Sequence, residues 1–192
     1  MAKLALLIGV SEYESGFNAL PAAVRDVEAL QRVLLDPEIG AFDEVKPLFN
    51  PNRQTMEDEI DALFSRCSKE DLVLVFFSGH GVKDSRGQLH FATKITQKDA
   101  KGNLRRPTAV SARFVRETMT SSRCRRQVVI LDCCYSGAFD PALQGKDDRS
   151  VDLLSELGAE GRVVLTSSSS TELSFEQQDA DLSIYTRYLV EG

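Results

Sequence analysis

A histidine set between two glycines is the first residue whose surroundings suggest chemistry. It stands in the segment Ser-Gly-His-Gly at positions 78–81, directly after the apolar run of residues 71–77. Glycines on both sides leave the ring uncovered on a sharply turning backbone, so we expect His80 to be exposed at the end of a strand. Taken alone, this motif is equally consistent with a histidine in a tight structural turn.

Two adjacent cysteines follow a second apolar run, in the segment Asp132-Cys133-Cys134-Tyr-Ser-Gly. Because side chains alternate along a strand, only one thiol can reach a given side of a sheet, and we expect the other to pack. Free cysteine is among the most buried residue types, so either thiol alone favours a structural role. An exposed histidine at the same sheet edge changes that interpretation, because histidine can take the thiol's proton and leave a thiolate that attacks a carbonyl.

Short apolar runs alternate with helical patterns along the chain. We expect strands at 4–8, 44–49, 71–77, 127–131 and 162–166, and helices at 22–35, 55–67 and 111–119. Continuous apolar strands are typical of a sheet that is covered on both faces. The alternation predicts an α/β fold with a mainly parallel central sheet and helices on both faces. Thr55 and Asp58 have the spacing of a capping box, and Ser111 is a plausible N-cap.

Three polar stretches interrupt this alternation, at 83–107, 140–149 and 167–183. Each follows the carboxyl end of a predicted strand, which is the edge at which open α/β sheets bind ligands. Long irregular segments in a compact domain are usually functional loops or linkers. We therefore expect these stretches at the ligand-binding edge of the sheet.

Composition and charge exclude several classes of protein. The 192 residues carry 23 basic and 29 acidic side chains, a net charge of −6 that argues against nucleic-acid binding. No apolar run approaches the ~18 residues that span a bilayer, so we expect no membrane association and a cytoplasmic location. The 4 cysteines lack the paired spacing of a zinc site or a disulfide framework, so we expect reduced thiols and no bound metal.

The motifs resemble those of caspase-like cysteine peptidases, and of metacaspases and bacterial orthocaspases in particular. His80 precedes Cys134 by about 50 residues, as the histidine precedes the cysteine in caspases. The second motif differs from the Gln-Ala-Cys of animal caspases and is similar to the metacaspase Asp-Ser-Cys-His-Ser-Gly, with Cys133 in the place of the serine. The resemblance runs from residue 4 to about 188. It implies one caspase-like domain over residues 1–192, a three-layer sandwich of the caspase-hemoglobinase type whose final strand would lie beyond them.

The resemblance also implies a catalytic role for the motif residues. Cys134 would be the nucleophile, and His80 the general base and then the acid for the leaving amine. The backbone N–H groups of Gly81 and Cys134 would form the oxyanion hole. No carboxylate stands out as a third member, so the Cys-His dyad usual in the family is expected.

Substrate specificity follows from the same resemblance. Asp26, Ser78 and Asp132 would line the pocket for the residue before the scissile bond. Paired carboxylates there would select arginine or lysine, so we expect protein or peptide substrates with a basic residue at that position. The alternative is structural: Asp26 could serve the start of a helix, and Asp132 could cap a strand end.

The sequence also leads to expectations about autocleavage, cofactors and oligomeric state. Lys146 and Arg149 suit the predicted specificity and are candidate sites of autocleavage. The stretch at 83–107 offers only Asp84 and Asp99, too few oxygen ligands for a calcium site, so we expect calcium independence and no cofactor. Metacaspase-like enzymes are typically monomers, and we expect the same here.

Two other functions stay open at this point. A catalytically silent caspase-like module could bind partners, although the presence of both His80 and Cys134 counts against it. A nucleotide- or flavin-binding α/β domain would need a glycine-rich phosphate loop after the first strand, and the sequence has none there. We expect His90 to pack or cap near a strand end, and Cys67 and Cys124 to be incidental.

Overall fold

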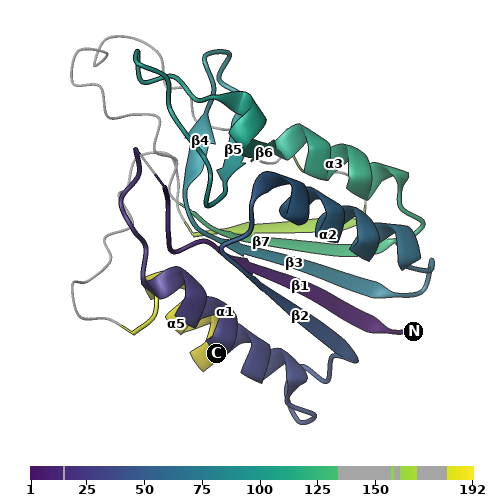
Figure 1. The fold of residues 1–192 in the computed structure, drawn as a ribbon. Helices are drawn as coiled ribbons and strands as arrows, with labels where there is room; N and C mark the ends of the chain where they lie inside the picture. Colours follow the sequence, from purple (N-terminus) through teal and green to yellow (C-terminus); the bar gives the residue numbers. More distant parts are fainter. Residues whose placement is uncertain (15, 134–156, 158–160, 168–180) are drawn as a thin grey trace.

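Parallel strands form the central sheet of the computed structural model, which describes all residues except 15, 134–156, 158–160 and 168–180 (Figure 1). The strands are β1 (Lys3–Gly9), β2 (Glu44–Phe49), β3 (Leu72–Ser78), β7 (Arg126–Asp132) and β8 (Arg162–Thr166). Their order across the sheet is β2-β1-β3-β7-β8, and every neighbouring pair is parallel. The predicted α/β fold with a mostly parallel sheet is confirmed.

Helices cover both faces of this sheet, as Figure 1 shows. Helices α1 (Ala22–Leu35) and α5 (Ile184–Glu191) pack on one face, and α2 (Arg53–Arg66) and α3 (Ala112–Ser121) pack on the other. Phe76 of β3 lies in the core under α1, whereas its neighbour Phe77 lies in the core under α2. A strand buried on both faces needs apolar residues at every position, which explains the continuous apolar runs. No helix in the described part of the chain is long and apolar enough to cross a membrane.

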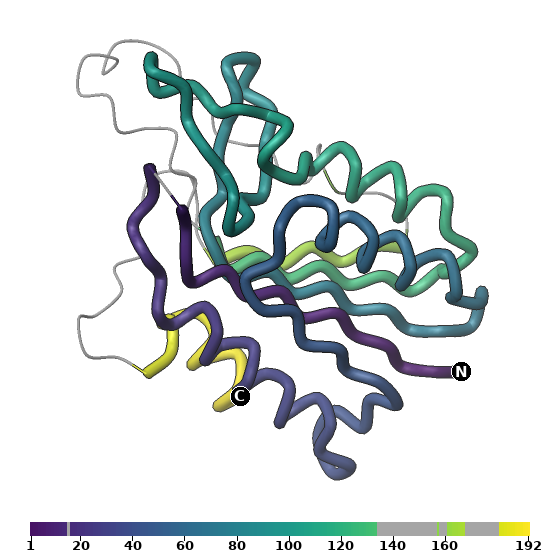
Figure 2. Tube along the Cα trace, in the orientation of Figure 1, coloured from purple at the N-terminus to yellow at the C-terminus, as the bar shows by residue number. Residues whose placement is uncertain are grey.

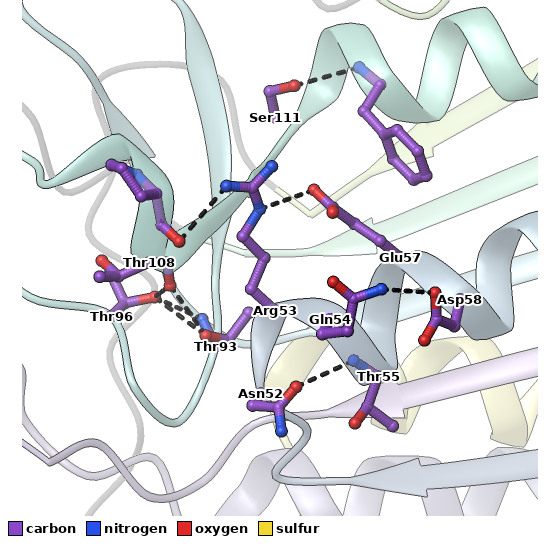
Figure 3. A network of polar contacts seen from close by, with 12 residues as sticks. Asn52, Arg53, Gln54, Thr55, Glu57, Asp58, Thr93, Thr96, Thr108 and Ser111 are labelled. Carbon is purple, nitrogen blue, oxygen red and sulfur yellow. Dashed lines mark hydrogen bonds and ion pairs between the residues drawn. The ribbon is translucent and has the colours of Figure 1, made fainter.

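The helix starts differ in part from the sequence prediction. Helix α2 begins two residues earlier than predicted, because Asn52 is its N-cap and accepts a hydrogen bond from the Thr55 N–H at 2.9 Å (Figure 3). The predicted capping box is therefore wrong, and Asp58 instead accepts from the side chain of Gln54 at 2.7 Å. Ser111 caps α3 as predicted, accepting from the Phe114 N–H at 3.1 Å.

A small antiparallel sheet includes part of the polar stretch at 83–107 that was expected to be irregular. It contains β4 (Gly81–Lys83), β5 (Leu89–Ala92) and β6 (Ala109–Ser111), with the 3-10 helix η1 (Arg106–Thr108) before β6. Strands of 3 or 4 residues show too little alternation to be recognised in the sequence.

Polar contacts hold the loops beside this small sheet together and link them to α2 (Figure 3). The hydroxyls of Thr93 and Thr96 donate to the carbonyl of Thr108 at 2.9 and 2.7 Å. Arg53 of α2 pairs with Glu57 at 2.8 Å and reaches the carbonyl of residue 107 at 3.3 Å. Since β4 begins only three residues after β3 ends, the small sheet and β3 together hold the turn between them.

Candidate active site

His80 lies in the turn between β3 and β4, which we call the histidine turn (residues 79–81). Its backbone N–H donates to the Tyr13 hydroxyl at 3.0 Å, and its carbonyl accepts from the Ala92 N–H at 2.9 Å. The rings of Tyr13 and Phe17 flank the imidazole, with centroids at 4.9 and 5.5 Å. His80 is therefore half-buried rather than exposed, because the segment after β1 supplies aromatic neighbours that the glycines do not.

The contacts of the imidazole define which nitrogen can act as a base. Nε2 of His80 lies 2.9 Å from the carbonyl oxygen of Asn18. A carbonyl only accepts hydrogen bonds, so Nε2 carries the hydrogen in the neutral ring and the lone pair lies on Nδ1. The backbone carbonyl of Asn18 thus contributes to the orientation of the ring.

The three predicted specificity residues meet in one buried cluster on the α1 face of the sheet. Ser78 and Asp132 end the adjacent strands β3 and β7 and face each other in register. Each lies two residues after an apolar side chain of the α1 core, so both side chains point to that face. Asp26, from the second turn of α1, accepts a hydrogen bond from the Ser78 hydroxyl at 2.9 Å. The structure therefore brings Asp26, Ser78 and Asp132 together.

Two further residues complete this cluster and were missed from the sequence. Ser183 donates its N–H to Asp26 at 2.9 Å and its hydroxyl to Asp132, and the Thr186 hydroxyl donates to Asp132 at 2.9 Å. Ser183 is also the N-cap of α5 and accepts from the Thr186 N–H at 3.1 Å. The only available sequence signal was a serine before the final amphipathic stretch. We call Asp26, Ser78, Asp132, Ser183 and Thr186 the acidic cluster.

Burial of two carboxylates makes the acidic cluster electrostatically unusual. Asp26 is 0% exposed and Asp132 is 7% exposed. The pKa of Asp26 is raised to about 6, mainly by burial and to a smaller extent by the nearby Asp132 carboxylate, while hydrogen bonds from Ser183 and Ser78 lower it. A buried site with excess negative charge favours a cation that brings several N–H donors, such as a guanidinium.

The cysteines have different environments. Cys133 is buried in the core under α2 and α3, as expected for one member of the adjacent pair. Cys67 and Cys124 are also buried, and burial raises the pKa of Cys67 to about 11 and that of Cys124 above its ordinary value. High pKa values keep these two thiols protonated and poorly nucleophilic. Cys134 lies outside the described residues.

The remaining predicted residues are placed only in part. Gly81 is the first residue of β4 and pairs with Phe91 of β5. His90 is buried, with Nδ1 3.1 Å from the Gln88 carbonyl, so it packs in the small sheet as expected. The autocleavage candidates Lys146 and Arg149 lie outside the described residues.

Comparison with known proteins identifies the family. The caspase-domain family model matches residues 2–192. Metacaspase-8 of Arabidopsis thaliana is 28% identical over 153 residues, which cover 72% of this chain and 38% of that protein. The crystal structure of a Geobacter sulfurreducens protein superimposes with a TM-score of 0.57 and 19% identity, over 71% of this chain and 52% of that chain. The chain thus spans well under two thirds of the length of either protein.

The fold and the site therefore define a caspase-type α/β domain. The chain belongs to the caspase-domain family and is similar to a plant metacaspase.

Proposed function

We propose that this chain is a cysteine endopeptidase that hydrolyses peptide bonds after arginine or lysine. The observation that carries the proposal is the acidic cluster beside the histidine turn: Ser78 of the cluster lies two residues before His80. A cation held by Asp26 and Asp132 would bring the adjacent peptide bond to the carboxyl end of β3. Both the charge recognition and the proton transfer then take place at one edge of the sheet.

Cys134 is the nucleophile in this proposal. Its thiol proton passes to Nδ1 of His80, while the Asn18 carbonyl holds the Nε2 hydrogen. The thiolate attacks the carbonyl carbon, and the N–H groups of Gly81 and Cys134 stabilise the oxyanion. The C–N bond breaks as His80 returns the proton to the leaving amine, and water then hydrolyses the thioester.

Basic specificity is supported by the charge of the acidic cluster. A guanidinium or ammonium beside Asp26 would supply the positive charge that these carboxylates lack in the described structure. The Ser183 hydroxyl, which donates to Asp132, must then share or yield that carboxylate to the substrate. Lys146 and Arg149 are proposed sites of autocleavage by the same specificity, and we propose a calcium-independent monomer.

Matched fluorogenic peptides that end in Arg, Lys or Asp test the proposal. We expect hydrolysis after Arg and Lys, no hydrolysis after Asp, and no response to calcium or a chelator. Cys134→Ala should abolish turnover, whereas Cys133→Ala is the matched control and should keep it. Preference for Asp would refute basic specificity. Absence of turnover in a chain that folds normally would instead support a caspase-like module that binds partners.

Autocleavage needs its own measurement. Incubation of the active protein followed by mass spectrometry should reveal new termini after Lys146 or Arg149, and none in Cys134→Ala. An active protein that stays intact would overturn the autocleavage proposal alone.

A further inference from the structure

Next to the histidine turn, the Tyr13 hydroxyl takes the place of a backbone hydrogen bond of the central sheet. β1 and β3 are parallel and in register up to Gly9 and Ser78, and the Val10 N–H continues the ladder to the Ser78 carbonyl at 2.9 Å. In a regular parallel ladder, the next bond would join the His80 N–H directly to the Val10 carbonyl. Here the Tyr13 hydroxyl stands between them, accepting from the His80 N–H at 3.0 Å and donating to the Val10 carbonyl at 2.8 Å.

This insertion separates the two strand ends at the site. In Figure 2 the purple segment that follows β1 leaves the sheet at the edge where β3 continues into the small sheet. On the opposite side of the turn, the ladder is regular, since the Gly79 N–H donates to the Asp132 carbonyl at 3.2 Å. One side of the histidine turn is thus held by backbone, and the other by a tyrosine side chain.

The Tyr13 ring adds a second contact to the same histidine. It lies 4.9 Å from the imidazole, and it also contacts Phe17 at 5.6 Å, whose ring carries Lys98 Nζ at 4.6 Å. A single side chain therefore contacts both the backbone and the ring of His80. A shift of this tyrosine would change the distance from Nε2 to the Asn18 carbonyl.

We infer that Tyr13 is a positioning residue that sets the orientation and tautomer of His80. The inference rests on the proposed function for its catalytic consequence, but not for its structural part. Tyr13 acts through His80 and needs no contact with the substrate. Its hydroxyl holds the backbone, its ring packs on the imidazole, and together they keep the Nε2 hydrogen directed at Asn18.

The test compares Tyr13→Phe with Tyr188→Phe. Both variants lose one hydroxyl, but Tyr188 is 71% exposed on α5, so it is a matched control. Because the chain has 2 histidines, ¹⁵N-histidine NMR gives two sets of ring signals, and His80→Ala assigns them. We expect a dominant Nε2-protonated His80 in the wild type and in Tyr188→Phe. In Tyr13→Phe we expect mixed tautomers and a shifted midpoint of the His80 pH titration.

Kinetics give the second readout, with an Arg-containing peptide. Loss of one hydrogen bond should lower kcat of Tyr13→Phe by roughly 3- to 10-fold. KM should stay within about 2-fold, because the acidic cluster that would bind the arginine is untouched. Unchanged His80 signals, or a raised KM with unchanged kcat, would overturn the inference.

The experiment distinguishes failure of the proposed function from failure of the inference about Tyr13. If the wild type shows no turnover, the proposed function fails, while the NMR comparison still decides the role of Tyr13. If Tyr13→Phe does not fold, amide exchange in the wild type decides it: the His80 N–H should be protected, and exchange at the rate of a free peptide would contradict the Tyr13 contact.

Discussion

The acidic cluster and the histidine turn lie at the same strand end but differ in burial and in the groups that contact them. Ser78 and His80 are two residues apart, yet both carboxylates of the cluster are buried and the histidine is half-buried. Side-chain hydroxyls and one N–H hold the carboxylates of the cluster, whereas aromatic rings and backbone groups hold the histidine.

The difference between the two regions has a physical reason. A carboxylate in a dry environment gains strongly from a cation, because burial destabilises the unpaired charge. A proton carrier instead needs access to its reaction partner and a defined tautomer, which partial burial and the Asn18 carbonyl supply. In the proposed function, recognition of the substrate's charge and transfer of the proton would therefore occur in two differently buried regions at one strand end.

Removing one carboxylate of the acidic cluster should have the largest effect on activity while leaving the histidine turn unchanged. We expect Asp132→Asn to lower kcat/KM for an Arg peptide by roughly 30- to several-thousand-fold, the range for loss of one partner in a buried charge pair. As a control, Cys134 in Asp132→Asn should react with iodoacetamide, a neutral reagent, at the same rate and with the same pH profile as in the wild type. Mass spectrometry follows the alkylation. Asp26→Asn and the double variant measure the coupling between the carboxylates. Equal losses for Arg and uncharged peptides would contradict the role of the cluster.

The raised pKa of Asp26 predicts how stability depends on pH. Its pKa is about 6 in the folded chain against an ordinary value of 3.8, so between these values the folded state binds more protons. The free energy of unfolding should therefore fall as pH rises from 4 to 7, by up to about 3 kcal/mol relative to Asp26→Asn.

Urea unfolding of both proteins at several pH values measures this difference. Asp61→Asn, on the exposed side of α2, is the control and should follow the wild type. A difference between wild type and Asp26→Asn that is independent of pH would show that Asp26 ionises at its ordinary pKa.

Steric crowding in the histidine turn should give the next largest effect. An alanine Cβ at Gly79 would lie 2.9 Å from the Phe77 ring and 3.1 Å from the Tyr13 hydroxyl. Overpacking of this kind lowers the free energy of unfolding by about 1–3 kcal/mol. Gly79→Ala should therefore unfold at a lower urea concentration and have a lower kcat than the wild type. Adding Tyr13→Phe removes the hydroxyl that crowds the new Cβ, so the combined loss of stability should be smaller than the sum of the two single losses. Strict additivity would mean that Tyr13 does not crowd position 79.

The fold was largely predictable because burial on both faces leaves a plain signature. The predicted bounds of the helix at 22–35 and of the strands at 44–49 and 162–166 agree with the structure. The start of α2 was misplaced because Asn52, outside the apolar periodicity, takes the cap. The small sheet was missed because its strands are short and because the Thr93 and Thr96 hydroxyls that support it bond to the carbonyl of Thr108, 15 and 12 positions away.

The site residues were predictable only where the residue type itself is part of a recognisable motif. Asp26, Ser78 and Asp132 were identified through the family resemblance, and the register of β3 and β7 explains why they meet. Asn18 acts through a backbone carbonyl, which any residue has. Ser183 reaches Asp26 across 157 positions, a contact that no local pattern encodes.

The smallest predicted effect concerns the two helix caps inside and outside the acidic cluster. Ser183→Ala and Asn52→Ala should each cost about 1 kcal/mol of stability, because each removes an N-cap. Only Ser183 also donates a hydroxyl to Asp132, and the proposed substrate must compete with that donor. Ser183→Ala should therefore lower KM for an Arg peptide by roughly 2- to 10-fold, the effect of one hydrogen bond, while Asn52→Ala leaves KM unchanged. A raised KM in Ser183→Ala would instead mean that the hydroxyl helps to hold Asp132 in place for the cation.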